Sequence, residues 1–222
     1  IAAHLLEASS EDVEFRTGRF EVKGTDSSVS MTEVMLHTWL CHNLPDGLEP
    51  NLDSDYTFDP ENFSFPTGTH LAAVEVDTET GRVHVRDYVC VQDVGVIVNP
   101  LIVDGQVQGG LSQGIGQALF EEILYDEDGQ LKSGTLADYY LPSAVDVPHY
   151  RTAYTVTEAT TNTLGVKAVG ETGTTAAPPA IVNGVLDALR PLGVPDVTMP
   201  LTPVKVWSAI QQARGSQEEV TG

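Results

Sequence analysis

The sequence is poor in cysteine, in basic residues and in long apolar runs. Its two cysteines, Cys41 and Cys90, lie in no CxxC or metal-ligand spacing, which favours reduced thiols but leaves a disulfide between them open. It contains no stretch of about 18 or more apolar residues, so no transmembrane helix is predicted. Lys and Arg number 11 against 32 Asp and Glu, for a net charge of −21. Such a chain repels nucleic acids and anionic membranes, so neither is an expected partner.

The excess of acid has two open explanations, solubility and an origin in high salt. The second is favoured by the presence of only four lysines. The chain begins without Met or a signal peptide, and "IAAHLLEAS" resembles the tail of an amphipathic helix. We therefore expect a fragment of a larger cytoplasmic protein, with part of any functional site supplied from elsewhere.

Most catalytic signatures are missing as well. The six histidines form no HExxH and no paired metal-ligand spacing, and neither GxSxG nor a GK[ST] phosphate loop occurs. No strand leads directly into GxGxxG, which excludes a dinucleotide fingerprint. A calcium loop within 46–61 is disfavoured because Phe58 stands where glycine is required. No metal-ligating residue is predicted.

Hydrophobic periodicity predicts an alternation of helices and strands. Two hairpins are expected, Val13–Val22 around Thr17-Gly18 and a Val-rich pair around Thr78–Gly81, with a further strand in "YRTAYTVTEA". The segment 46–61 holds six acids and no base, which indicates an exposed loop or edge strand.

Helices are expected over residues 1–8, after an N-cap at Ser30, over 102–124 before a turn at 126–129, from about Ala176 with Gly193 after its end, and from Pro203. Proline is expected in the first turn of the Ala176 helix. The simplest fold is one α+β domain over residues 1–222, a mixed β-sheet with helices packed on it as a two-layer α/β sandwich.

The first candidate site is the helix "GQVQGGLSQGIGQAL", which interleaves glycine with glutamine. Each interior glycine costs up to ~1 kcal/mol relative to alanine, so five of them need a reason. One reason is the close approach of a large polar cofactor to the backbone, with glutamine amides as uncharged donors and acceptors. The other is close helix–helix packing with glutamine facing solvent. The spacing does not decide between them.

The second candidate is Glu171 in "LGVKAVGETGTTAAPPA", surrounded by small and apolar residues, with Lys167 as the nearest cation. A carboxylate in an apolar pocket has its charged form disfavoured, which suits a general base. Amide groups near the start of the following helix would attract anionic groups. The alternative is a loop glutamate that faces water.

Several motifs occur in an order that resembles one known family. They are "FPTGTHLAAVEVDTETGRVHV", "DVGVIVNPLIVDGQVQGGLSQGIGQALFEE", "DYYLP" and "GVKAVGETGTTAAPPAIVNGVLDAL". The chain resembles the C-terminal molybdenum-cofactor-binding part of the large subunit in the xanthine dehydrogenase / aldehyde oxidase / aerobic carbon monoxide dehydrogenase family. The resemblance runs from about Ala2 to Ala213 and is nearest to the bacterial type that binds molybdopterin cytosine dinucleotide.

The resemblance implies roles for residues of both candidate sites. Glu171 takes the role of the base beside molybdenum, and the backbone of the preceding loop approaches the pterin. Gln113 takes the helix position closest to the pterin. The cofactor-binding residues so implied are Gln106, Gln108, Gly109, Gly110, Gln113, Gly114, Lys167, Ala168, Val169 and Gly170. One departure from the family pattern, Val94 and Val96 in "DVGVIVNP", carries no functional conclusion.

The resemblance also implies what lies outside the chain. The earlier half of the large subunit, an iron–sulfur subunit and an FAD subunit would complete the enzyme, as a dimer of heterotrimers. We therefore expect these residues alone to be inactive. Two other hypotheses stay open: a degenerate structural or assembly subunit, and an unrelated nucleotide-binding module. The substrate, whether carbon monoxide, a purine, an aldehyde or an N-heterocycle, does not follow from the sequence.

Overall fold

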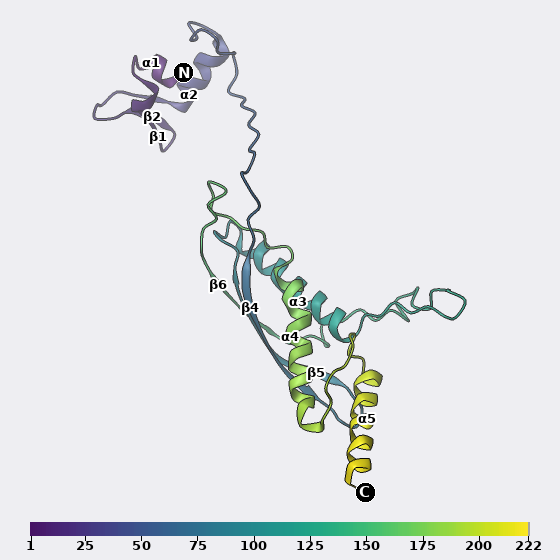
Figure 1. The fold of residues 1–222 in the computed structure, drawn as a ribbon. Coiled ribbons are helices and arrows are strands. Elements are labelled where there is room, and N and C mark those ends of the chain that lie inside the picture. Colours follow the sequence, from purple (N-terminus) through teal and green to yellow (C-terminus); the bar gives the residue numbers. More distant parts are fainter. Residues whose placement is uncertain (222) are drawn as a thin grey trace. The chain divides into compact units, whose positions relative to one another are not determined.

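The computed structural model describes residues 1–221, with side chains to residue 216, and shows two compact units, Ile1–Asp59 and Pro60–Gly222 (Figure 1). The sequence predicts one domain over residues 1–222, and each compact unit is described by itself below. The acidic segment 46–61 forms no helix or strand and is exposed. With six acids and no base, it offers no apolar face to bury.

The first unit is a small sheet with two helices. Its elements are α1 (Ala2–Leu5), a 3₁₀ turn (Ser10–Asp12), β1 (Val13–Arg16), β2 (Arg19–Val22), β3 (Ser28–Ser30) and α2 (Met31–Leu40). The predicted hairpin is confirmed: Arg16 pairs with Arg19 across Thr17-Gly18, and both turn residues have positive φ. Ser30 and Glu33 form the capping box that starts α2. The first helix is shorter than predicted, because Glu7 adopts a left-handed conformation.

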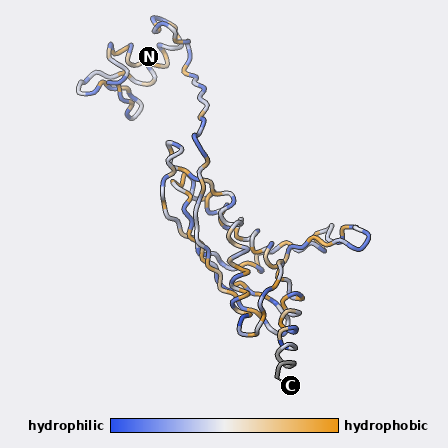
Figure 2. Tube along the Cα trace, viewed as in Figure 1, coloured by the Kyte–Doolittle hydropathy of each residue, from blue (hydrophilic) through white to orange (hydrophobic). Residues whose placement is uncertain are grey.

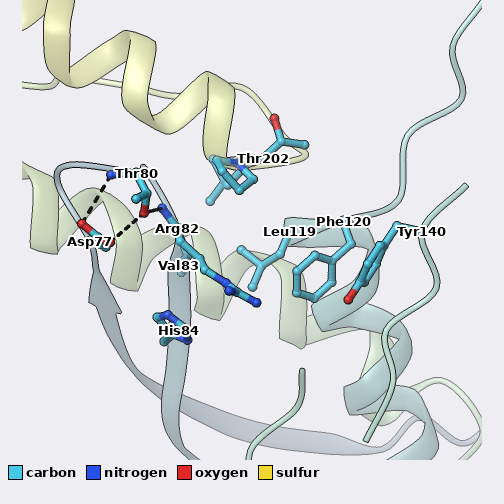
Figure 3. A pocket seen from close by; sticks show the side chains of 11 residues that line it. Asp77, Thr80, Arg82, Val83, His84, Leu119, Phe120, Tyr140 and Thr202 are labelled. Atoms are coloured by element: carbon cyan, nitrogen blue, oxygen red, sulfur yellow. Dashed lines mark hydrogen bonds between the residues drawn. The ribbon is translucent and has the colours of Figure 1, made fainter. Parts of the chain in front are cut away.

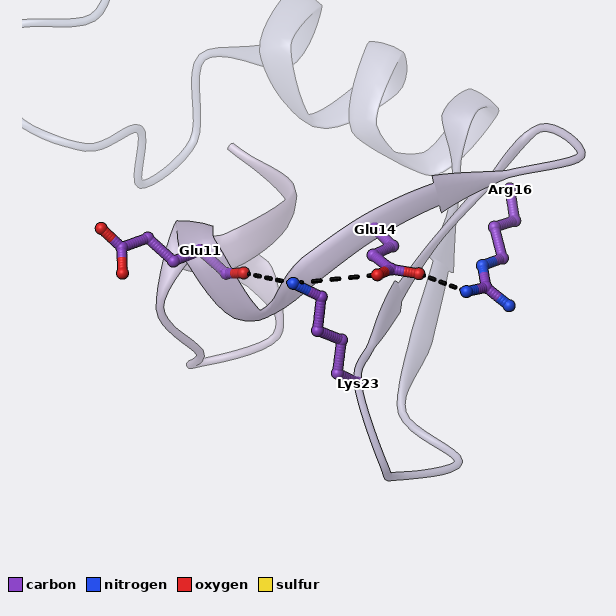
Figure 4. A network of polar contacts seen from close by, with 4 residues as sticks. All are labelled: Glu11, Glu14, Arg16 and Lys23. Carbon is purple, nitrogen blue, oxygen red and sulfur yellow. Dashed lines mark hydrogen bonds and ion pairs between the residues drawn. The ribbon is translucent and has the colours of Figure 1, made fainter.

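Polar contacts link the β1–β2 hairpin to the 3₁₀ turn (Figure 4), in addition to the packing of Val13 and Phe20 on a small apolar cluster. The ammonium of Lys23 donates to the Glu11 carbonyl at 2.8 Å and lies 3.7 Å from the Glu14 carboxylate, which also pairs with Arg16. These groups are exposed, so each pair contributes little to stability.

The second unit is a two-layer α/β structure, as predicted. Strands β4 (Thr67–Val76), β5 (Val83–Asp93) and β6 (Tyr150–Thr155) form a mixed sheet in the order β4-β5-β6, antiparallel then parallel. Helices α3 (Pro100–Leu119) and α4 (Thr172–Leu189) pack on each other, and α4 packs on β4 (Figure 1). A 3₁₀ turn (Arg190–Leu192) and α5 (Pro203–Thr221) follow. The core between the layers is aliphatic, with Tyr88, Leu111, Ile115, Ile181 and Leu189 fully buried.

The helix α3 ends at Leu119, five residues before the predicted end at residue 124. The amides of Phe120 and Glu121 both donate to the Gly116 carbonyl, and the amide of Leu201 donates to the Ala118 carbonyl at 2.7 Å. The chain thus leaves the helical path because an amide from a distant segment satisfies the Ala118 carbonyl at the end of the helix. Residues 120–149 then form an arm without helices or strands, whose tip at 126–129 is the predicted turn and is hydrophilic (Figure 2).

The helix α4 begins at Thr172, four residues before the predicted start, so its prolines lie inside it. Proline lacks an amide hydrogen, and Pro178 and Pro179 therefore leave carbonyls of the first turn without their helical donors. The helix nevertheless extends back to Thr172 because Gly173 lies against the backbone of α3. Tertiary packing here overrides the preference for proline in the first turn.

Candidate cofactor-binding site

The loop before α4 is fastened to the end of β5 by backbone hydrogen bonds. The Val96 amide donates to the Gly165 carbonyl at 3.0 Å, and the Lys167 amide donates to the Val94 carbonyl at 2.9 Å. Gly95 and Gly165 both have positive φ, and a side chain on Gly95 would come within 2.3 Å of the Gly165 carbonyl oxygen. The crossing therefore requires glycine at position 95.

The side chain of Lys167 turns into the protein. Its ammonium lies 3.0 Å from an Asp93 carboxylate oxygen, and both side chains are almost fully buried. The same oxygen accepts from the Gly95 amide at 3.0 Å. The pKa of Asp93 is held well below its ordinary value, mainly by a hydrogen bond from Thr157 and also by those from Gly95 and Lys167. Ala168 and Gly170, further along the loop, are exposed, and Val169 is half-buried.

Glu171 stands at the N-cap of α4, where its side chain makes no capping hydrogen bond. The residue is exposed in this chain rather than held in an apolar pocket. The next residue, Thr172, is buried, and its amide and hydroxyl both donate to the Val169 carbonyl, at 3.3 and 3.0 Å. The backbone on both sides of Glu171 is therefore fixed while the carboxylate itself stays open to solvent.

A pocket of about 360 Å³ adjoins Glu171. Its wall comes from the start of β4, the end of β5 and the first turn of α4, and its lining is Phe65, Pro66, Thr67, Gly68, His70, Gln92, Glu171, Thr172, Thr175 and Ala176. Glu171 is the one charged group in this lining if His70 is neutral.

Behind the pocket lies a buried polar network that the sequence analysis missed. His70 contacts Tyr88 at 2.8 Å through Nδ1 and Gln92 at 2.7 Å through Nε2, and the Cys90 sulfur lies 3.4 Å from Nε2. The Gln92 amide nitrogen also reaches the Thr172 carbonyl at 3.4 Å, which ties the network to the first turn of α4. The strand register could have revealed it, because His70 pairs with Cys90, and Tyr88 and Gln92 lie two residues to either side.

Burial sets the protonation of this network. It lowers the pKa of His70 and raises the pKa of Cys90 and of Tyr88, since each charged form loses its hydration. Burial thus favours the neutral form of each group, and neutral His70 can accept a hydrogen bond from Gln92 through one ring nitrogen.

The glycines of α3 separate into two sets. A side chain on Gly110 would lie 2.9 Å from the Thr174 amide nitrogen, and one on Gly114 would lie 2.5 Å from the Ala177 side chain. These two glycines serve helix packing against α4. By contrast, side chains on Gly105 and Gly109 would meet nothing within 4 Å. Packing within this chain explains the first set and leaves the second without a partner.

The glutamines of α3 are exposed, but not all on one side. Gln106 and Gln113 are seven residues apart and lie on one face, whereas Gln108, two residues from Gln106, points elsewhere. The Gln106 side-chain oxygen lies 3.7 Å from the point where Gly170 would carry a side chain. The structure therefore brings the α3 glutamine face next to the Glu171 loop.

A larger pocket of about 620 Å³ lies at the other end of α3 and contains none of the predicted site residues (Figure 3). Arg82, just before β5, and His84 of β5 line it together with Leu119, Phe120 and Tyr140, and the turn before β5 is held by Asp77 and Thr80 (Figure 3). Among the residues that the structure describes, no group of three or more His, Cys, Asp or Glu side chains could hold a metal ion. Within the same residues, no helix is long and apolar enough to cross a membrane.

Comparison with known proteins identifies the relatives of this arrangement. The molybdopterin cofactor-binding domain family matches residues 1–148. The carbon monoxide dehydrogenase large chain of Hydrogenophaga pseudoflava is 37% identical over 213 residues, which cover 96% of this chain and 26% of that protein. The nicotine 6-hydroxylase large subunit of Paenarthrobacter nicotinovorans is 39% identical over 211 residues, or 94% of this chain and 26% of that protein.

Solved structures agree with the sequence relatives. The crystal structure of a Cu,Mo-CO dehydrogenase matches with a TM-score of 0.88 and 33% identity over 96% of this chain and 26% of that chain. Quinoline 2-oxidoreductase from Pseudomonas putida 86 matches with a TM-score of 0.87 and 39% identity over 95% of this chain and 27% of that chain. The chain thus spans about a quarter of the length of these relatives.

Fold and relatives together define the class of this chain as a molybdopterin cofactor-binding domain, similar to a part of those large chains. The chain belongs to the molybdopterin cofactor-binding domain family. This confirms the resemblance seen in the order of the sequence motifs.

Proposed function

We propose that this chain forms part of the active site of a molybdenum hydroxylase, binds molybdopterin cytosine dinucleotide and supplies Glu171 as the general base. The observation that carries the proposal is the position of Glu171. It stands between a loop fastened to β5 and a helix start packed on α3, with its carboxylate directed to open space beside a pocket. When bound, the cofactor supplies the redox chemistry of oxidative hydroxylation or carbon monoxide oxidation, with water as the oxygen source.

The residues of α3 fit such a group. Gly105 and Gly109 leave the backbone uncovered, Gln106 offers an uncharged donor and acceptor beside the Glu171 loop, and Gln113 offers the same groups about two turns further along that face of α3. The exposed backbone at Ala168 and Gly170 lies on the same loop. Gln108 points to another side of α3, so its predicted contact to the cofactor would need a more distant part of the dinucleotide. Gly110 and Gly114 would act by bringing α4 close to α3.

Within this arrangement the chain's own residues have simple roles. Glu171 accepts a proton at its carboxylate from the water-derived oxygen nucleophile. The neutral pocket wall at His70 and Gln92 introduces no positive charge that would pair with this carboxylate. The rest of the large subunit would exclude water from Glu171, which this chain by itself leaves exposed.

The partners belong to the same proposal. Because the chain spans 26% of its relatives, we propose that the remainder of the large subunit completes the site, with iron–sulfur and FAD subunits in a dimer of heterotrimers, in the cytoplasm. Residues 1–222 would then be one cofactor-binding part of that subunit, inactive by itself. Expression of these residues alone should give a protein without stoichiometric molybdenum and without turnover, and the opposite result would contradict this part of the proposal.

Replacement of Glu171 by Gln in the complete complex tests the base. We expect turnover to fall by about 10²-fold or more, the size of a general-base contribution, with molybdenum and cytosine nucleotide content unchanged. Glu79→Gln, in the exposed turn before β5, is the matched control and should leave turnover unchanged. Unchanged turnover of Glu171→Gln would favour the alternative of a structural or assembly subunit. Release of a nucleotide without a pterin on denaturation would favour an unrelated nucleotide-binding module.

A further inference from the structure

The cation nearest to Glu171 in the sequence is directed away from it. Lys167 lies four residues before Glu171, yet its ammonium is 3.0 Å from Asp93 at the end of β5, and its side chain is only 12% exposed. A lysine free to turn into the site would pair with the Glu171 carboxylate and weaken it as a base. The Asp93 contact removes that competitor from the pocket.

The Asp93 carboxylate is held as firmly as the lysine. It accepts hydrogen bonds from the Gly95 amide and from Thr157, in addition to Lys167, and its side chain is 9% exposed. The carboxylate therefore joins three segments, the end of β5, the turn after β6 and the loop that leads to Glu171. A buried ion pair of this kind contributes less to net stability than to the choice of one conformation, in the systems where such a role has been measured.

Further contacts fix the chain on the N-terminal side of Glu171. The Asn162 side chain holds Val166 with two hydrogen bonds: its oxygen accepts from the Val166 amide at 3.1 Å, and its nitrogen donates to the Val166 carbonyl at 2.9 Å. The Lys167 amide is bonded to Val94. After Lys167, Ala168 and Gly170 are exposed, up to the Thr172 contacts with Val169. Lys167 is thus the last charged anchor before the carboxylate, and between the two only the half-buried Val169 packs on the core.

We propose that Lys167 is a positioning residue, whose buried pairing with Asp93 fixes the path of residues 168–171 and so places the Glu171 carboxylate. This inference rests on the proposed role of Glu171 as the base. The Lys167 side chain then holds the loop from inside the protein, and only the Lys167 backbone lies on the cofactor side.

Lys167→Met in the complete complex is the direct test, with Arg86→Met as the matched control. Arg86 also forms a salt bridge across strands of this sheet, with Glu75 at 2.7 Å, but both partners are 59% exposed. We expect amide hydrogen exchange in residues 164–171 to become about tenfold faster in Lys167→Met, as loss of one charged hydrogen bond would produce. We also expect kcat to fall about tenfold with KM nearly unchanged, because the misplaced group acts on the reaction rather than on binding. Arg86→Met should show neither change.

Lys167→Arg should restore part of both signals, since a guanidinium can also pair with Asp93. If Lys167→Met does not assemble, Asp93→Asn, which keeps the side-chain size, carries the same expectation. Unchanged exchange in 164–171, or faster exchange with the kcat of the Arg86→Met control, would overturn the proposal. The Glu171→Gln variant separates the two ideas: full activity there would reject the base, while faster loop exchange in Lys167→Met would still establish the anchor.

Discussion

The two sides of the Glu171 segment differ in what they contact. On the inner side, Gly173 and Gly110 let α4 touch α3, and Gln92 reaches the Thr172 carbonyl. On the outer side, Gly109, Gly170 and Glu171 are exposed. Packing within this chain explains the small residues on the inner side. The outer side has the same residue types without partners in this chain, and this contrast is what favours a bound cofactor over helix packing alone.

The largest effect is expected where the inner side is tightest. In Gly173→Ala the new methyl group would lie 2.5 Å from the Val107 carbonyl oxygen and 2.8 Å from the Leu111 amide nitrogen. Backbone atoms on a packed helix cannot move aside, so the free energy of unfolding of the chain should fall by about 3 kcal/mol or more. Urea unfolding measures this. A loss under about 1 kcal/mol would mean that α3 and α4 do not pack as closely as described.

The next effect concerns pH and the network behind the pocket. Burial lowers the pKa of His70 below 6.5, so between the two values the unfolded chain binds a proton that the folded chain does not. The contribution of His70 to stability is therefore complete above about pH 6.5 and is lost as the pH falls toward the lower folded value. The urea midpoint of the unaltered chain should therefore fall between pH 7 and pH 5, and in His70→Gln the part of this pH dependence that comes from His70 should disappear. His42→Gln, at an exposed site, should keep it, and an unaltered slope in His70→Gln would contradict the buried assignment.

The outer side is tested by two glutamines of the same helix. Gln113→Ala should lower retention of cytosine nucleotide by the complete complex about two- to tenfold, the equivalent of one hydrogen bond of about 0.5–1.5 kcal/mol. Gln108→Ala, on another side of α3, should have a smaller effect. Nucleotide released per molybdenum after denaturation measures both. Equal losses would show that the cofactor extends further round α3 than the exposed glycines suggest.

The smallest effect separates stability from binding at one position. A methyl group at Gly109 would meet nothing within 4 Å, so Gly109→Ala should stabilise the chain by about 0.5–1 kcal/mol through helix propensity. The same substitution should reduce cofactor retention in the complex if the cofactor approaches the backbone there. A stabilised variant with full cofactor content would move the cofactor away from this face.

Local patterns made most of the elements predictable. The turn at Thr17-Gly18, the Ser30 cap, the hairpin of β4 and β5 and the start of α5 at Pro203 were all placed from a few adjacent residues. The predicted helix ends were wrong where contacts with distant segments set the end of the helix. The end of α3 depends on Leu201, and the start of α4 depends on Gly110, neither of which is near in sequence to the helix end it controls.

The same division holds for the candidate site. Glu171 and the Gly/Gln helix could be singled out from their unusual neighbourhoods, and the motif order identified the family. The Lys167–Asp93 pair could not, because its residues are brought together only by the crossing at Gly95. The His70 network needs, in addition to the residue pattern, the register of β4 on β5.

The sequence by itself determined the family, the two-layer architecture and the two candidate site segments, because turn residues, helix caps and hydrophobic periods act over a few neighbouring positions. Only the tertiary structure decided which glycines of α3 contact α4 and which remain open, and that Lys167 turns inward. These choices depend on the approach of two backbones distant in sequence, and steric exclusion at that contact has no local signature in the order of the residues.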